Sequence, residues 1–365
     1  MGEPQSTITL SSHLSISIQP LRSYQNIELF AGAGGMALGM ERAGFSHLLL
    51  NDSDRYATET LQKNRPEWYI VHGDVAEIDF SPYRDKVDLL TGGFPCQAFS
   101  YAGKKRGMED TRGTLFYEFA RALKESAPKV FLAENVRGLV SHDRGRTLET
   151  MVKVFESMGY AVMAPRILKA IHYHVPQKRE RLFIVGIKKE YANSVSFQWP
   201  KESPRYYTLK DALKKGDLFP TDVPKSIGQT YPEKKKKILD LVPPGGYWRD
   251  LPLELQKSYM MKSFYLGGGK TGIARRISWD EACLTLTCAP AQKQTERCHP
   301  DETRPFQVRE YARIQTFPDE WEFAGSMTQQ YKQIGNAVPV NLAYALGLSL
   351  IDVLNQIEGV DNAKV

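Results

Sequence analysis

The chain has 365 residues, 42% of them hydrophobic, and a formal net charge of +6 at pH 7. Because this length exceeds the size at which one hydrophobic core usually stops growing, we expect two domains. No apolar run approaches the roughly 20 residues that span a bilayer, and the N-terminus has an acidic Glu3 where a signal peptide would carry positive charge. The composition therefore argues against a membrane protein and favours a soluble, cytoplasmic one.

The four cysteines form no disulfide-like framework, and a cytoplasmic setting would keep them reduced. Cys283, Cys288 and Cys298 lie close to His299 in the sequence and could nominally bind zinc. However, residues 282–289 alternate like a strand, and two strand residues five positions apart point to opposite faces. We therefore expect no metal site.

Residues 1–24 are rich in serine and threonine and lack a helical period, so they are expected to form a loosely held tail. A short apolar strand at 26–30 then runs into a glycine-rich turn at 31–35, and a helix is expected at 36–43. Glycines at the start of a helix let the backbone come close to a ligand. This turn is the first candidate for a cofactor site.

The next expected strand, at 45–50, stops at a polar turn that contains Asp52, about twenty residues beyond the glycines. In β-α-β units with this geometry, the acid binds ribose hydroxyls. The spacing from Gly32 onward also fits the glycine fingerprint of a nicotinamide dinucleotide enzyme. From the residues alone, the class of cofactor stays open.

The apolar run that begins at Val87 is typical of a buried strand, and it delivers Cys96 into a turn of glycine and proline. A free thiol is only slightly ionised at neutral pH, so a nucleophilic role needs further support. Taken alone, a cysteine at a strand end is more often structural. The following segment, 101–113, combines three glycines with four cations and is typical either of a lid over a polyanion or of a plain exposed loop.

A helix is expected at 115–125 and a strand at 129–133, which ends at Glu134. A carboxyl group at the end of such a strand suits general acid work, with a salt-bridged structural acid as the alternative. After a helix at 147–158, a pair of strands is expected around 177–186. Alternation there places three polar side chains on one face, either in the site or in a surface salt-bridge ladder: Gln177, Arg179 and Arg181.

The basic excess of the chain lies in residues 188–305, which contain 21 Lys and Arg against 14 Asp and Glu. Clustered positive charge is the footprint of a polyanion partner, although a solvated surface or flexible linker is the plainer interpretation. We expect Lys270, Arg275 and Arg276 to reach phosphates or guanine edges. A phosphate-loop interpretation of 267–271 fails because Phe264 stands where its first glycine is required.

The remaining residues, 306–365, are expected to return the chain to the first domain. A helix is expected at 309–317, then a Gly335-Asn336 turn, and a closing helix at 341–354.

The octapeptide Gly93-Phe-Pro-Cys-Gln-Ala-Phe-Ser100 resembles the signature of the DNA (cytosine-5)-methyltransferases. The resemblance extends in order through further motifs and covers most of residues 26–187 and 306–345. These motifs are residues 28–41, 51–54, 73–74, 133–136, 177–181 and 333–336. Six spaced motifs in the right order are hard to produce by chance.

The resemblance implies a doubly wound α/β fold, a Rossmann-like sheet of S-adenosylmethionine-dependent methyltransferases with a smaller basic target-recognition domain. It assigns S-adenosylmethionine as the cofactor, with Ser53 where family members often have a tryptophan. The implied cofactor-binding residues are Phe30, Ala31, Gly32, Gly34, Gly35, Asp52, Ser53, Asp74, Val75, Gly93, Pro95, Asn336 and Ala337.

The same resemblance makes Cys96 the nucleophile that attacks C6 of the target cytosine. Glu134 would bond the N3 edge of the base, and Arg181, on the face it shares with Arg179, would hold the carbonyl oxygen of the base. The base would be flipped out of the duplex. The implied DNA contacts outside the basic segment are Ser100, Lys104, Lys105, Arg106 and Arg112.

We therefore expect a sequence-specific DNA cytosine-5 methyltransferase, monomeric, acting on double-stranded DNA, as the modification arm of a restriction-modification system whose endonuclease acts independently. The expected division is a tail at 1–24, a catalytic and cofactor domain at 25–187, a recognition domain at 188–305 and a return at 306–365. The alternatives are a relative acting on RNA, a nicotinamide oxidoreductase and a catalytically silent DNA-binding relative.

Overall fold

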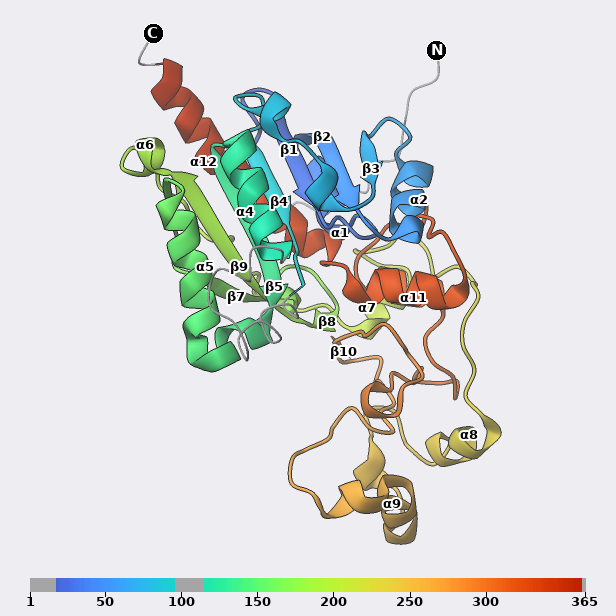
Figure 1. Cartoon of the computed structure of the whole chain (residues 1–365). Coiled ribbons are helices and arrows are strands. Elements are labelled where there is room, and N and C mark those ends of the chain that lie inside the picture. Colours follow the sequence, from blue (N-terminus) through green and yellow to red (C-terminus); the bar gives the residue numbers. More distant parts are fainter. Residues whose placement is uncertain (1–17, 96–114, 363–365) are drawn as a thin grey trace, which may run out of the picture.

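The computed structural model describes residues 18–95 and 115–362, and its centre is one mixed sheet of eight strands (Figure 1). The strand order is β3-β2-β1-β4-β5-β9-β6, with β7 also paired to β9. Strands β3 to β5 in this order are parallel, whereas β9 runs antiparallel to β5, β6 and β7. The strands are β1 (Tyr24–Leu29), β2 (Phe45–Asp52), β3 (Ile70–His72), β4 (Leu89–Gly92), β5 (Val130–Val136), β6 (Tyr160–Val162), β7 (Arg166–Lys169) and β9 (Glu180–Lys188).

Helices cover both faces of this sheet, because its central strands are apolar on both sides. In β5, Val130 and Leu132 belong to one core cluster, whereas Phe131 and Ala133 belong to the other. The first cluster is closed by α1 and α12, the second by α4 and α5. These helices are α1 (Gly35–Ala43), α4 (Leu115–Ser126), α5 (Arg146–Ser157) and α12 (Val340–Asn362), and α2 (Arg55–Asn64) and α6 (Lys189–Ala192) lie beside the sheet. The expected doubly wound α/β fold is confirmed.

One expectation about apolar runs was wrong. The stretch Met327–Asn362 is long and apolar enough to cross a membrane by length and composition alone, with a mean hydropathy of 1.7 in its most apolar window. However, 72% of that window is buried inside the protein. Its second part, α12, packs along α1, and a Cβ at Gly39 would lie 2.4 Å from that of Ala343. The stretch therefore has the packing of a core helix of a soluble protein.

Residues 188–305 contain little regular structure. After α6 at their start, their α-helices are α7 (Leu209–Leu213), α8 (Glu233–Leu239) and α9 (Leu253–Met260). The two-residue strand β10 (Cys283–Leu284) follows and pairs with β8 (Gln177–Lys178). A small core cluster of its own gathers residues between Tyr231 and Cys298. Figure 1 shows α8 and α9 well away from the sheet, below β8 and β10. The strand expected across 282–289 is thus much shorter than its alternation indicated.

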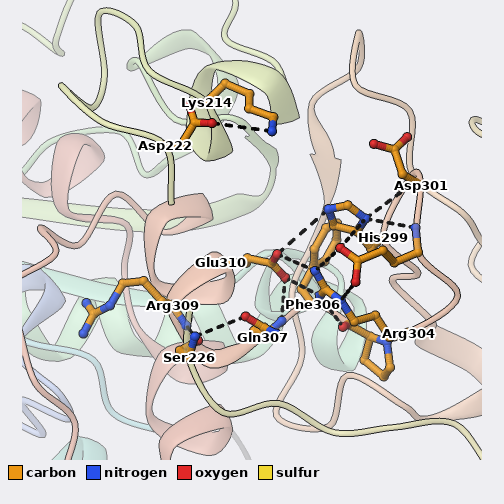
Figure 2. A network of polar contacts seen from close by, with 12 residues as sticks. Lys214, Asp222, Ser226, His299, Asp301, Arg304, Phe306, Gln307, Arg309 and Glu310 are labelled. Carbon is orange, nitrogen blue, oxygen red and sulfur yellow. Dashed lines mark hydrogen bonds and ion pairs between the residues drawn. The ribbon is translucent and has the colours of Figure 1, made fainter. Parts of the chain in front are cut away.

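The return to the sheet is made by α10 (Val308–Ile314) and α11 (Met327–Asn336). A polar network holds the start of α10 (Figure 2). The buried Glu310 carboxylate accepts hydrogen bonds from the guanidinium of Arg304 at 2.7 and 2.9 Å and from the Gln307 N–H at 2.6 Å. The Ser226 hydroxyl accepts from the Arg309 N–H at 2.9 Å. These bonds fix the junction between the basic segment and α10.

Candidate active site

Glu134 and Arg181 form an ion pair at the carboxyl end of β5. Arg181 Nε donates to Glu134 Oε1 at 2.8 Å, and about one eighth of each side chain is exposed, 13% and 12%. The pair exists because β9 runs antiparallel to β5, which sets Val136 opposite Arg181 and Glu134 opposite Phe183. The two groups come from strands that the sequence motifs identified separately, and the fold brings them together.

Burial raises the pKa of Glu134 above its usual range, and the positive charges of Arg181 and Arg179 oppose that rise. A carboxyl group taken out of water favours its neutral form, whereas a nearby cation favours the charged form. Of these effects, desolvation is the largest. Glu134 therefore holds a proton at a higher pH than a free glutamate does, as a general acid requires.

The end of β4 lies against Glu134. A Cβ added at Gly93 would lie 2.9 Å from Glu134 Oε2, so only glycine leaves that carboxyl group its present position. Next to it, Asn135 donates from Nδ2 to the Phe94 carbonyl at 2.9 Å and fixes the course of the chain into Pro95. Cys96 follows directly and lies outside the described residues, as do Ser100, Lys104, Lys105, Arg106 and Arg112.

Gln177 and Arg179 lie in the interior behind this pair. Arg179 donates to the carbonyl oxygens of Leu286 at 3.2 Å and Gly335 at 2.8 Å. Gln177 donates to Gln315 Oε1 at 2.8 Å. Together they tie the start of β9 to β10 and α11. A hairpin-like pair of strands was expected around 177–186. Instead β8 ends at Lys178 and pairs with β10, whereas β9 begins at Glu180 and pairs with β5, β6 and β7.

The glycine turn after β1 has backbone angles that glycine tolerates well: φ is +54° at Gly32 and +83° at Gly34, which caps the N-terminus of α1. Open space surrounds the Cα of Gly32, where a Cβ would have no neighbour within 4 Å. Phe30 precedes the turn, also with a positive φ of 58°. Gly35 packs against the chain that follows α11, since its Cβ would lie 3.2 Å from that of Ala337.

Asp52 lies at the end of β2, directly beside this turn. Its Oδ2 accepts a hydrogen bond from the Gly32 N–H at 2.7 Å, and its Oδ1 accepts from the Asp54 N–H at 2.8 Å. Burial raises its pKa. Ser53 follows it, and the carboxyl end of the neighbouring β3 leads to Asp74 and the buried Val75.

The expected cofactor residues from both ends of the chain meet here. Asn336 ends α11, and its Oδ1 accepts a hydrogen bond from the Cys288 thiol at 3.0 Å. The structure thus places a glycine turn, a carboxylate and the Asn336-Ala337 return around the carboxyl ends of β1, β2 and β3. In open α/β sheets, ligands bind at such carboxyl ends, where the strand order reverses.

The three cations expected to contact DNA are engaged within the protein. Arg276 is 4% exposed and donates to four backbone carbonyls and to Thr303. Arg275 forms a two-pronged pair with Glu281, at 2.5 Å to each carboxylate oxygen. Lys270 donates to the Ser263 and Leu266 carbonyls. The structure therefore corrects the expectation for Arg275 and Arg276, because guanidinium groups bonded inside the protein cannot also bond base edges.

A family model described as C-5 cytosine-specific DNA methylase matches residues 24–352. The chain belongs to this family. The Type II methyltransferase M.Eco47II of Escherichia coli is 66% identical to the methylase over 334 residues, which cover 92% of this chain and 80% of that protein. The Type II methyltransferase M.Sau96I of Staphylococcus aureus is 54% identical over 343 residues, covering 93% of this chain and 78% of that protein.

Solved structures share the fold. A DNA modification methyltransferase encoded within a prophage in E. coli matches with a TM-score of 0.65 and 24% identity, covering 91% of this chain and all of that chain. The S. pombe Dnmt2 methyltransferase matches with a TM-score of 0.57 and 19% identity, covering 92% and 100% of the two chains.

The methylase is thus a DNA (cytosine-5)-methyltransferase of the Type II restriction-modification kind. The family resemblance and enzyme class expected from the sequence are confirmed, and the nicotinamide oxidoreductase is set aside.

One residue that supports the glycine turn of the methylase was missed by sequence reasoning. Trp321 follows α10, is 1% exposed, and donates from its indole nitrogen to the Ala33 carbonyl at 3.1 Å. Its ring also backs Gly34, whose Cβ would lie 3.0 Å from the ring. The only sequence signal was a large aromatic residue in the returning segment. Trp321 therefore holds the turn from behind.

We expect the Trp321→Phe variant to bind S-adenosylmethionine about 5-fold to 100-fold more weakly, because the buried Ala33 carbonyl loses its partner. Trp321→Leu should weaken binding further, since the ring contact with Gly34 is also lost. The dissociation constant is measured by titration of the purified variants, with melting temperatures as a check on folding. The matched control is Trp279→Phe, whose indole bonds Asp301 instead. Unchanged affinity in the leucine variant would rule out this supporting role.

Proposed function

We propose that the methylase modifies one cytosine within a specific sequence of duplex DNA, through a covalent adduct between Cys96 and C6 of a flipped-out base. The observation that carries the proposal is the Glu134–Arg181 pair, packed at 2.8 Å beside the Gly93 turn that leads to Cys96. An acid, a cation and a cysteine turn at one edge of the sheet match the needs of that reaction.

Cytosine is electron-poor enough at C6 for a thiolate to add, but its C5 is a poor nucleophile until that addition occurs. Attack by the Cys96 thiolate forms the S–C6 bond and moves electron density toward N3 and C5. Arg181 supplies positive charge next to Glu134 and holds the carbonyl oxygen of the base. The cysteine therefore activates the ring, and the cation fixes the ring's orientation.

Glu134 donates a proton toward N3 and so relieves the negative charge that the addition creates. Its raised pKa keeps that proton on the carboxyl group to a higher pH than in a free glutamate. C5 of the resulting enamine then accepts the methyl group. Loss of the C5 proton to a base and expulsion of the Cys96 thiolate restore the aromatic ring. N3 then returns its proton to Glu134, which regenerates the free enzyme.

S-adenosylmethionine supplies the electrophilic methyl group of its sulfonium when it is bound. The residues fit this cofactor because the open space at Gly32 lies next to a half-buried carboxylate suited to ribose hydroxyls. Asp52 holds the ribose, with Ser53 following it. The glycine turn, with Phe30 and Ala31, encloses the methionine part, while Asp74 and Val75 border the adenine. Gly93, Pro95, Asn336 and Ala337 complete the pocket.

In a stacked base the neighbouring bases cover the ring faces from which the thiolate must reach C6 and the methyl group must reach C5, so the target nucleotide must leave the duplex at a cost of a few kcal/mol. Ser100 and the cations Lys104, Lys105, Arg106 and Arg112 contact the DNA around it. Lys270, which keeps a partly exposed position, contributes to phosphate binding. Residues 188–305 form the recognition domain between the catalytic domain at 25–187 and the return at 306–365.

The protein acts as a cytoplasmic monomer and as the modification arm of a restriction-modification system, alongside an endonuclease that works independently. The names of the two relatives, both Type II methyltransferases, support the restriction-modification part of this proposal.

Incubation of the purified protein with S-adenosylmethionine and unmethylated duplex DNA, followed by sequencing of 5-methylcytosine, tests the function. We expect methylation at one cytosine of one short sequence. Methylation scattered without sequence preference would overturn the specific role, and methylation of RNA in preference to duplex DNA would overturn the substrate.

A further inference from the structure

The arginines of the basic segment differ sharply in what they bond. Residues 188–305 contain six arginines, all described by the structure. Five are engaged by acids or carbonyl oxygens of the protein: Arg205 by Asp217, Arg275 by Glu281, Arg276 by carbonyls, Arg297 by the Glu296 and Thr285 carbonyls, and Arg304 by Glu302 and Glu310. Arg249 is exposed and has no carboxylate partner among the described residues.

Arg249 is held on a braced loop. Its guanidinium lies over the ring of Trp248, 5.2 Å from the ring centre, and Trp248 itself is buried. The carboxylate of the neighbouring Asp250 accepts a hydrogen bond from the Tyr247 N–H at 2.8 Å, so it does not neutralise Arg249. The Arg249 carbonyl accepts a hydrogen bond from Gln256 at 2.8 Å. The side chain is thus pre-oriented while its N–H groups bond none of the residues at 18–95 and 115–362.

The two buried arginines explain why this loop is rigid. Arg275 donates to the carbonyls of Gly245 and Gly246, and Arg276 donates to that of Val242. Trp248 N–H adds a bond to the Ile273 carbonyl at 3.1 Å. Arg275 and Arg276 therefore act as braces behind the loop, although their positive charges were expected from the sequence to contact DNA.

The loop is also tied to the catalytic centre. Ile277 directly follows the bracing Arg276, and the chain runs from there to Leu286 within ten residues. The Leu286 carbonyl accepts a hydrogen bond from Arg179, just before β9. Reading one base while modifying another needs both sites held at a fixed separation. A braced loop joined to β9 through Ile277 to Leu286 provides that fixed separation.

We propose that Arg249 is a specificity-determining residue of the methylase, which reads the O6 and N7 acceptors of a guanine in the major groove. An exposed guanidinium with free N–H groups is the side chain best suited to a two-pronged bond with guanine. Because the Arg249 side chain already stacks on Trp248, it loses less conformational entropy when it binds. The inference rests on the proposed sequence-specific reaction and deepens it.

The test uses the full chain on a random-sequence duplex library, with S-adenosylmethionine, followed by sequencing of the methylated sites. Wild type is compared with Arg249→Lys, Arg249→Ala and Lys262→Ala. The lysine variant keeps the charge but loses the planar fork. Lys262 is the matched control, since it is exposed in the same segment and its side chain makes no ion pair or hydrogen bond with the described residues. Melting temperatures confirm that each variant folds.

Both Arg249 variants should relax the preference for guanine at one position by about tenfold to a hundredfold, while other positions keep theirs. Lys262→Ala should lower the rate at all sites alike and reduce the salt slope of binding by about one unit. If Arg249→Lys and Arg249→Ala keep the wild-type preference and lose only rate, Arg249 is a phosphate contact and the inference is wrong. If wild type itself shows no preferred sequence, the proposed function fails first, and the inference with it.

Discussion

The Cys96→Ser variant is expected to transfer no detectable methyl groups, a loss of at least about 10⁴-fold, while it binds DNA nearly as well as wild type. A serine hydroxyl is a far weaker nucleophile than a thiolate, so C6 of the base is not attacked and C5 stays inert. The thiol itself contributes little to the DNA interface. Single-turnover transfer and equilibrium DNA binding measure the two effects separately.

The control is Cys288→Ser, because a serine hydroxyl can still donate to Asn336 as the thiol does. That variant should keep most of its activity. Comparable transfer by the Cys96 and Cys288 variants would mean that the reaction needs no cysteine nucleophile.

The second large effect concerns Glu134. Replacing it with glutamine should slow transfer by about 10² to 10⁴-fold, the usual contribution of a general acid, and leave the affinity for S-adenosylmethionine unchanged. Glutamine keeps the size of the side chain and a hydrogen bond to Arg181 but cannot give up a proton to the ring. The matched control, Glu149→Gln, alters an exposed acid on α5 and should be neutral.

The pH dependence of this variant gives an independent check. Because the pKa of Glu134 is raised, the acid form persists above the usual range and is lost only as the pH rises through the shifted value. The rate advantage of wild type over the glutamine variant should therefore shrink as the pH rises through the raised pKa of Glu134. An advantage that grows with pH would show that Glu134 acts in its charged form.

Local sequence patterns predicted the cofactor side of the site well. The spacing between the glycine turn and Asp52 predicted that the two would meet, and Gly32 N–H donates to Asp52 at 2.7 Å. Such a pair lies within one β-α-β unit, whose geometry is fixed by short-range rules. The strand expected at 129–133 is likewise present as β5, which extends to Val136 and presents Glu134.

Contacts between segments far apart in the chain could not be predicted from the sequence. Trp321 bonds Ala33 across 288 positions, and no periodic pattern points from one to the other. Charge counting also failed to separate two uses of arginine. The sequence of a basic segment shows how many cations are present. Only the fold shows that the guanidinium groups of Arg275 and Arg276 are hydrogen-bonded inside the protein, whereas that of Arg249 bonds none of the described residues.

The central claim is that Cys96 forms a covalent bond with the target base, and a mechanism-based trap tests it most directly. Duplex DNA that carries 5-fluorocytosine at the methylated position is incubated with the protein and S-adenosylmethionine, then separated on a denaturing gel. Fluorine at C5 cannot leave as a proton does, so the adduct cannot break down. We predict a denaturant-resistant protein–DNA complex for wild type and none for Cys96→Ser. Absence of that complex with wild type, under conditions in which ordinary DNA is methylated, would contradict the covalent mechanism.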